Sequence, residues 1–113
     1  MIADTPTAEV ANNASQSRFE LWLNGDLVGI LGYYDIDANS GSTGAQHRRG
    51  APIVSFLHTV IVEDFGHRGL AAVIVRGALD AARRYGWRVR PVCTYVQRFV
   101  AAHPEYRDML VAV

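Results

Sequence analysis

The sequence predicts an α+β fold, with helices packed on a mixed, mostly antiparallel sheet. A hairpin pattern occupies residues 18–36, and an apolar strand follows at 53–62. An amphipathic helix over 67–85 then leads into a short strand at 87–93. A crossover helix makes the strands it joins parallel when they are neighbours. The predicted order is therefore strand, strand, long loop, central strand, helix, strand, helix.

The composition indicates a single folded domain. Of the 113 residues, 50% are hydrophobic and 19% are charged, which is typical of a globular protein. Eleven basic residues balance eleven acidic ones, so no net field attracts nucleic acid or a membrane. The single cysteine, Cys93, excludes an internal disulfide and a multi-cysteine metal cluster. We expect a cytoplasmic protein, monomeric or homodimeric, that binds neither nucleic acid nor membrane.

The domain is expected to begin at Arg18, after a flexible tail. Residues 1–17 are small and polar and offer little to a core. From Arg18 onward, apolar and polar residues alternate with a period of two, which places Phe19, Leu21 and Leu23 on one face of a strand. Asn24-Gly25 supplies the two positive-φ residues of a tight turn, and residues 27–36 return as the second strand of an antiparallel hairpin.

Residues 37–51 are rich in Gly, Ser, Asn and charge and form a long loop. This loop is either a flexible hairpin tip or a substrate lid that carries His47, Arg48 and Arg49.

The third strand, residues 53–62, is apolar at nearly every position. Such a strand is expected to be central and buried on both faces. His58 then points into covered structure, either as a hydrogen-bonded core residue or as part of an active cleft.

The helix over 67–85 has one apolar stripe for packing on the sheet, formed by Leu70, Ile74, Ala78, Ala81 and Tyr85. Gly77 is costly inside a helix, and a close approach to a strand would explain it. Gly86 ends the helix. The glycine-bearing turn before the helix leaves backbone N–H groups free to bind an anion, most often a phosphate.

The strand at 87–93 contains Pro91, which has no N–H for a ladder. This strand must therefore part from a neighbour there or lie at an edge, and a sheet that opens would leave a groove. Thr94 is a candidate cap for a helix that runs to about Ala102, where Pro104 stops it. Residues 105–113 add a helical turn or a docking tail.

Four short motifs in this order resemble the GNAT superfamily of N-acetyltransferases, in its small single-domain branch. They are His58-Thr59, Arg68-Gly69-Leu70-Ala71, Pro91-Val92-Cys93 and His103-Pro104-Glu105-Tyr106. The resemblance covers about four fifths of the chain and makes residues 18–113 a single GNAT-like domain.

The resemblance implies acetyl-CoA as a cosubstrate, with its pyrophosphate on the main chain of the turn after the central strand. The family pattern R/Q-x-x-G-x-G/A falls on residues 66–71, with Gly66 where Arg or Gln is usual. Pantetheine would lie in a split between the central strand and residues 87–92, which form a splayed parallel pair. The implied contacts are Ile61, Val62, His67, Arg68, Gly69, Leu70 and Ala71.

For catalysis, the resemblance points to a Tyr on the last helix as the acid, and Tyr95 is the candidate. Cys93 draws attention because the start of a helix favours its thiolate. Its role is that of a nucleophile, an acid or a packed small hydrophobic residue. Cys93 and His58 together would be the ingredients of acyl transfer through a thioester. Val60 stands where the branch usually carries Glu, so that carboxylate is missing.

Three functions remain open from the sequence. The expected one is transfer of acetyl from acetyl-CoA to an amine of a small molecule or a protein. The second is a degenerate module that binds acetyl-CoA or a partner protein without turnover. The third is a Cys/His thiol enzyme without CoA, which fits the Gly69–Ala71 turn poorly.

Overall fold

The structure is a computed structural model that describes residues 8–35, 51–62 and 69–112. Most of the predicted 37–51 loop, with His47, Arg48 and Arg49, lies outside the described residues. The strands are β1 Ala8–Asn13, β2 Arg18–Leu23, β3 Asp26–Asp35, β4 Ile53–Ile61 and β5 Arg88–Pro91. The α-helices are α3 Leu70–Tyr85 and α4 Thr94–Ala102, and the 3-10 helices are η1 Ala14–Gln16 and η3 Pro104–Met109.

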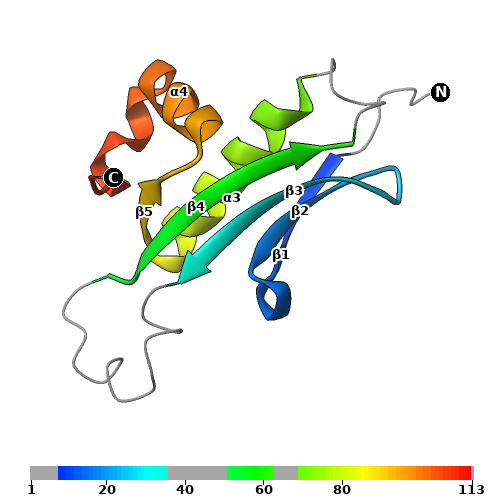
Figure 1. The fold of residues 1–113 in the computed structure, drawn as a ribbon, viewed down its shortest axis with the longest axis horizontal. Helices are drawn as coiled ribbons and strands as arrows, with labels where there is room; N and C mark the ends of the chain where they lie inside the picture. Colours follow the sequence, from blue (N-terminus) through cyan, green and yellow to red (C-terminus); the bar gives the residue numbers. More distant parts are fainter. Residues whose placement is uncertain (1–7, 36–50, 63–68, 113) are drawn as a thin grey trace.

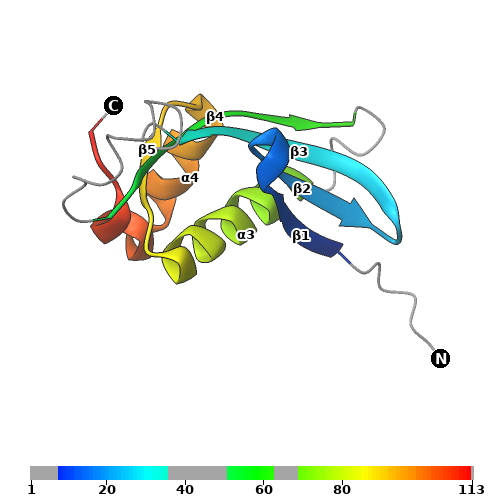
Figure 2. The same ribbon diagram turned by 90° about the horizontal axis from the view of Figure 1, so that it is seen from below.

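The five described strands form one sheet in the order β1-β2-β3-β4-β5, and among their four pairings only β4–β5 is parallel. Figure 1 shows β4 running across the molecule between β3 and β5, and Figure 2 shows α3 packed beneath the strands. The helix α4 follows β5 and contacts β4, β5 and α3. This arrangement confirms the predicted α+β class with its crossover helix and C-terminal helix.

The β2–β3 hairpin confirms the turn prediction. Asn24 and Gly25 have φ angles of 52° and 89°, so both adopt the left-handed conformation that a two-residue hairpin turn needs. Phe19, Leu21 and Leu23 are all buried on the side of the sheet that faces α3. The alternation of apolar and polar residues therefore predicted correctly that these three side chains share one face, while the β2–β3 register shifts between Leu21 and Trp22.

The N-terminal segment differs from the prediction of a flexible tail over residues 1–17. Ala8–Asn13 instead forms β1, which pairs antiparallel with β2 from Ala8↔Leu23 to Asn13↔Arg18. Pairing satisfies the backbone groups along the outer edge of β2, and that gain does not depend on side-chain type. The flexible-tail prediction is wrong for these six residues.

Gly77 lies in the middle of α3, directly against β1. A Cβ at this position would sit 2.6 Å from Val10 Cγ2 and 2.8 Å from Val10 Cβ. The predicted close approach of a strand is therefore confirmed. Helix α3 comes this near to the sheet because residue 77 has no side chain.

Gly77→Ala is expected to lower the free energy of unfolding by about 1–2 kcal/mol, because the new methyl group collides with a β-branched side chain that has little freedom. In a Val10→Gly background, which removes both the Cγ2 and the Cβ atom of residue 10, the same change is expected to stabilise the protein by up to about 1 kcal/mol, from helix propensity. Urea unfolding of the four proteins of the cycle measures both values. An equal effect of Gly77→Ala in the two backgrounds would contradict the contact.

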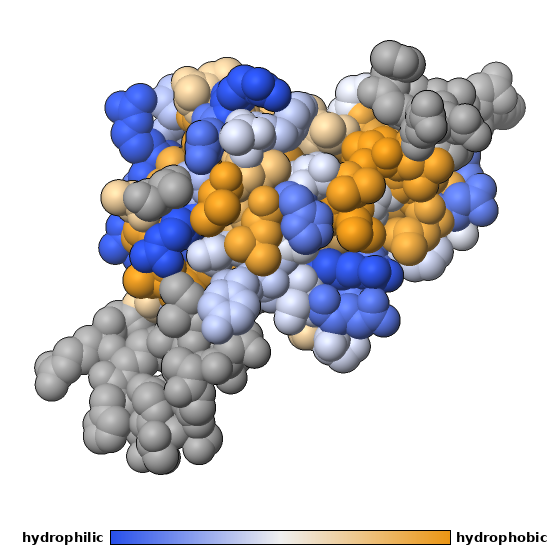
Figure 3. Space-filling view, in the orientation of Figure 1, coloured by the Kyte–Doolittle hydropathy of each residue, from blue (hydrophilic) through white to orange (hydrophobic). Residues whose placement is uncertain are grey.

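The first half of β4 is buried on both faces, but the second half is covered on one face and exposed on the other. The prediction of burial on both faces is therefore wrong for the second half. Val54, Ser55 and Phe56 are buried, but Leu57 and Val60 are 37% and 52% exposed. Both α-helices belong to the layer beneath the sheet, and Figure 3 shows apolar atoms on the opposite face. A near-continuous apolar run predicts burial, but it does not show which face another element covers.

Phe19 stands at the centre of the aromatic part of the core. Its side chain is 0% exposed, and its ring centroid lies 5.3, 5.9 and 6.2 Å from those of Tyr33, Phe56 and Trp87. These rings come from β2, β3, β4 and the residue before β5, so the cluster joins the hairpin to the parallel pair.

The C-terminal segment is fastened to α3. Tyr106 is buried and its hydroxyl donates to Asp80 at 2.7 Å, and Arg83 makes two 3.1 Å contacts with the Asp108 carboxylate. Burial, followed by the hydrogen bond to Asp80, raises the pKa of Tyr106. The next residues extend the sheet, since Val111 donates its N–H to Val89 of β5 at 2.9 Å.

None of the described helices is both long and apolar enough to cross a bilayer.

Candidate functional site

The predicted split lies between β4 and β5. Their ladder pairs Ile53–Phe56 with Arg88–Pro91 and ends there. The carbonyl of Phe56 accepts from the N–H groups of both Val92 and Cys93, at 3.1 and 2.9 Å. Beyond this point β4 continues to Ile61, while the segment that follows β5 turns away into α4. The separation that Pro91 predicted is confirmed.

A β-bulge in β4 lies beside this branch point. Gly32 pairs with His58 and Tyr33 pairs with Phe56, so Leu57 is the extra residue. Farther along, Val62 donates to the carbonyl of Val28 on β3 at 2.8 Å. Because backbone groups alternate in direction along a strand, those of Thr59 and Ile61 point to the other edge. That edge faces the split.

Cys93 occupies the N-cap of α4, the position predicted for Thr94. Its thiol is half-buried, and no side-chain hydrogen bond caps the helix. Cys93 Sγ instead lies 3.6 Å from Thr59 Oγ1, so the contact crosses the split from α4 to β4. The structure therefore places the cysteine at the helix start, as predicted, and at the branch of the two strands.

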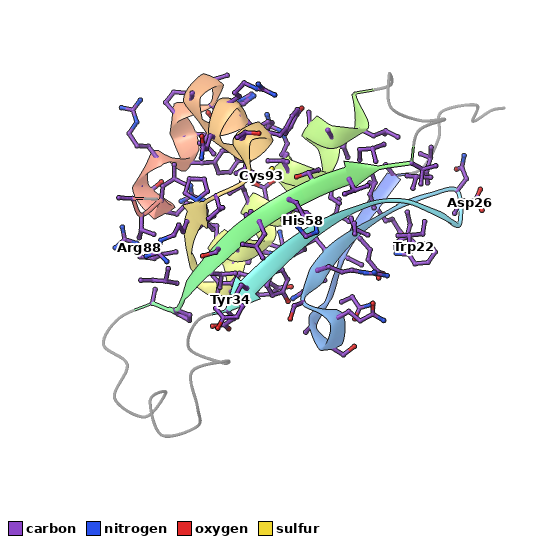
Figure 4. The ribbon with its side chains drawn as sticks, in the orientation of Figure 1. Trp22, Asp26, Tyr34, His58, Arg88 and Cys93 are labelled. Atoms are coloured by element: carbon purple, nitrogen blue, oxygen red, sulfur yellow. The ribbon has the colours of Figure 1, made fainter. Side chains whose placement is uncertain are left out.

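His58 is exposed on the sheet face opposite to Thr59. A Cβ on Gly32 would lie 2.8 Å from His58 Cε1 and 2.9 Å from His58 Nε2, so the imidazole rests on the glycine. Figure 4 shows His58 over β3 and β4, and Cys93 at the start of α4. The prediction that His58 points into covered structure is therefore wrong, because the side chain is exposed. Cys93 contacts Thr59, which lies on the opposite face, so the predicted Cys93–His58 pair is not formed.

Tyr95 lies in the first turn of α4, two residues beyond Cys93. Its side chain is half-buried and packs against the core. This position is on the helix that borders the split, and a role as acid stays a prediction.

The start of α3 has the features of an anion seat. Gly69 is its N-cap with a φ of 70°, and the space where a Cβ would stand is open. No side chain caps the helix, and its first turn has no acidic residue. Among the described residues, the first backbone N–H groups therefore have no capping side chain, and such groups can bind a phosphate-bearing ligand.

The other predicted contacts surround this seat. Ile61 ends β4, Val62 is exposed, Leu70 is buried and Ala71 is half-buried. Gly66, His67 and Arg68 lie outside the described residues. The described part of the predicted set thus lies where β4 ends and α3 begins.

The structure also has a cavity of about 570 Å³ that the sequence reasoning missed. It lies on α3 between β1 and α4, and its lining is Val10, Ala72, Val73, Arg76, Gly77, Asp80, Phe99 and His103. Gly77 within a helix was the one sequence signal for this place. The wall formed by Val10 was hidden because its segment was predicted to be a tail.

The comparisons with known proteins agree with this geometry. A family model described as GCN5-related N-acetyl-transferase matches residues 18–109. Solved structures that match include a ribosomal-protein-alanine N-acetyltransferase from Brucella melitensis biovar Abortus 2308, with a TM-score of 0.52 and 18% sequence identity. The match covers 85% of this chain and 62% of that chain, and it shows a shared fold. A search of curated proteins finds no match.

Proposed function

The chain belongs to the GCN5-related N-acetyltransferase family, and we propose that it transfers an acetyl group from acetyl-CoA to an amine of a small molecule or a protein. The observation that carries this proposal is the parting of β4 and β5 directly beyond Phe56 and Pro91, next to the open N-terminus of α3.

The described residues suit the parts of acetyl-CoA. The open backbone at Gly69 suits the pyrophosphate, because unpaired N–H groups and the helix dipole both favour negative charge. The edge of β4 at Thr59 and Ile61 suits the amides of the pantetheine arm, which need both donors and acceptors. When bound, acetyl-CoA supplies a thioester that an amine can attack.

The place of each side chain supports a proposed role for it. Cys93 is at the branch of the split, and its S–H has the position of an acid for a departing thiolate. Tyr95 on the same helix is the second candidate for that acid. His58 lies on the exposed face, where it is a candidate to take a proton from an amine that arrives over the sheet.

One observation favours a second candidate function, an acetyl-CoA-binding or protein-interaction module without turnover. The imidazole of His58 and the thiol of Cys93 lie on opposite faces of β4, so a direct relay between them is not available. If the second candidate binds acetyl-CoA, it differs from the first only in turnover.

Acetyl-CoA at millimolar concentration is expected to raise the melting temperature of the protein, because a ligand that binds only the folded state stabilises it. Release of free CoA across a broad panel of small amines and peptides then separates the two candidates. Absence of any thermal shift would overturn both the acetyltransferase and the acetyl-CoA-binding module. A shift without CoA release would leave the binding module.

Cys93→Ala is expected to lower kcat for CoA release by about a hundredfold, as removal of a positioned acid does. Its dissociation constant for acetyl-CoA is expected to stay within about threefold of the wild type, because the seat of the cofactor is backbone. Val92→Ala, at the exposed neighbouring position, is the control. An unchanged kcat in Cys93→Ala would assign the thiol to packing.

A further inference from the structure

We propose that Thr59 is a positioning residue whose hydroxyl hydrogen-bonds the Cys93 thiol and holds it at the branch of the β4–β5 split. The catalytic consequence rests on the proposed acetyl transfer. The hydrogen bond itself does not depend on that function.

The Thr59–Cys93 contact joins β4 to the start of α4 just beyond the end of the β4–β5 ladder. The β4–β5 ladder ends at Phe56, and Thr59 lies three residues farther along β4. Its Oγ1 is 3.6 Å from Cys93 Sγ, within hydrogen-bonding range for sulfur. Thr59 thus fixes the thiol on the helix side of the split. The thiol lies just beyond the two backbone hydrogen bonds that the carbonyl of Phe56 accepts.

The bulge at Leu57 makes this contact possible. Without an extra residue, Thr59 and Phe56 would point to opposite faces, because side chains alternate along a strand. With the bulge, Thr59 and Phe56 both face the helices, and the hydroxyl can reach α4.

Thr59 suits the thiol in both of its protonation states. A hydroxyl has one donor and two acceptor lone pairs, so it can accept from S–H and can donate to a thiolate. The N-cap position of Cys93 does not orient the thiol, since no side-chain hydrogen bond caps α4. The hydroxyl is therefore the group that can keep the sulfur in one place while its proton leaves or returns.

The S–H stretching band of the intact protein tests the hydrogen bond directly. The chain has one cysteine, so the band reports Cys93 alone. Thr59→Val keeps the branched shape but removes the hydroxyl, and Thr59→Ser keeps the hydroxyl but removes the methyl group. We expect the band of Thr59→Val to move to the position of a free S–H, and that of Thr59→Ser to stay with the wild type.

Two results would overturn the hydrogen bond. One is the same band in the wild type and in Thr59→Val. The other is an equal displacement of the band in Thr59→Val and Thr59→Ser, which would assign the effect to the methyl group. Circular dichroism of each variant verifies that it is folded.

Steady-state kinetics tests the positioning role. Thr59→Val is expected to lower kcat about tenfold, equivalent to the loss of one hydrogen bond, with the KM for acetyl-CoA unchanged. Thr59→Ser is expected to restore kcat to within about threefold of the wild type. A displaced band with unchanged kcat would overturn the positioning role. If the wild type has no turnover, the proposed function fails, and the band still decides the hydrogen bond.

Discussion

Gly69→Asp is expected to weaken acetyl-CoA binding about a hundredfold. Gly69 is the N-cap of α3, and a side chain there enters open space at the predicted pyrophosphate seat. A carboxylate about 5 Å from a doubly charged pyrophosphate, at an effective dielectric constant of about 40, costs about 3 kcal/mol. A hundredfold change in affinity corresponds to about 2.7 kcal/mol. Titration calorimetry with acetyl-CoA measures the loss.

Gly86 offers a matched control at the other end of the same helix. Its φ is 78°, close to the 70° of Gly69, and the space beside it is also open. Gly86→Asp therefore introduces the same backbone strain and the same charge, far from the seat, and is expected to leave affinity unchanged. Gly69→Asn separates charge from bulk. Equal affinities for Gly69→Asp and Gly86→Asp would place the pyrophosphate elsewhere.

Phe19→Ala is expected to lower the free energy of unfolding by about 3–5 kcal/mol, the range for truncation of a buried aromatic side chain. Phe19 is fully buried among three rings from different segments of the chain, so those rings cannot all close the space left behind. Urea unfolding followed by tryptophan fluorescence measures the difference, since Trp87 is a member of the same cluster.

Tyr34→Ala is the control for this truncation. It removes a ring of similar size from the exposed face of β3, where the side chain is 44% exposed, and is expected to cost less than about 1 kcal/mol. Phe19→Leu keeps the protein folded if the alanine variant does not fold, and is expected to cost about 1–2 kcal/mol. A loss in Phe19→Ala no larger than in Tyr34→Ala would contradict the central role of the cluster.

The parts of the fold that were predictable from the sequence are those with a local cause. The Asn24-Gly25 turn, the helix end at Gly86 and the close approach at Gly77 each follow from a backbone requirement at one residue. The missing N–H of Pro91 likewise predicted where β5 parts from β4. The position of the split in the candidate site was therefore available before the structure.

The parts that were missed depend on contacts between distant segments. Strand β1 has one large apolar side chain, Val10, and its place is set by the edge of β2 and by Gly77. The exposure of His58 depends on the bulge at Leu57, because without the extra residue His58 would share the buried face of Phe56. The Thr59–Cys93 contact joins positions 34 residues apart and required the bulge.

The order of the strands in the sheet is also their order along the chain. The β1–β2 and β2–β3 ladders close over short connections, so their loop-closure entropy is small and they suit early formation during folding. Only the β4–β5 ladder must close over an entire helix, α3. The split that this ladder defines is thus the part of the described sheet that costs the most chain entropy to assemble, and the proposed ligand seat depends on the least local pairing among the described strands.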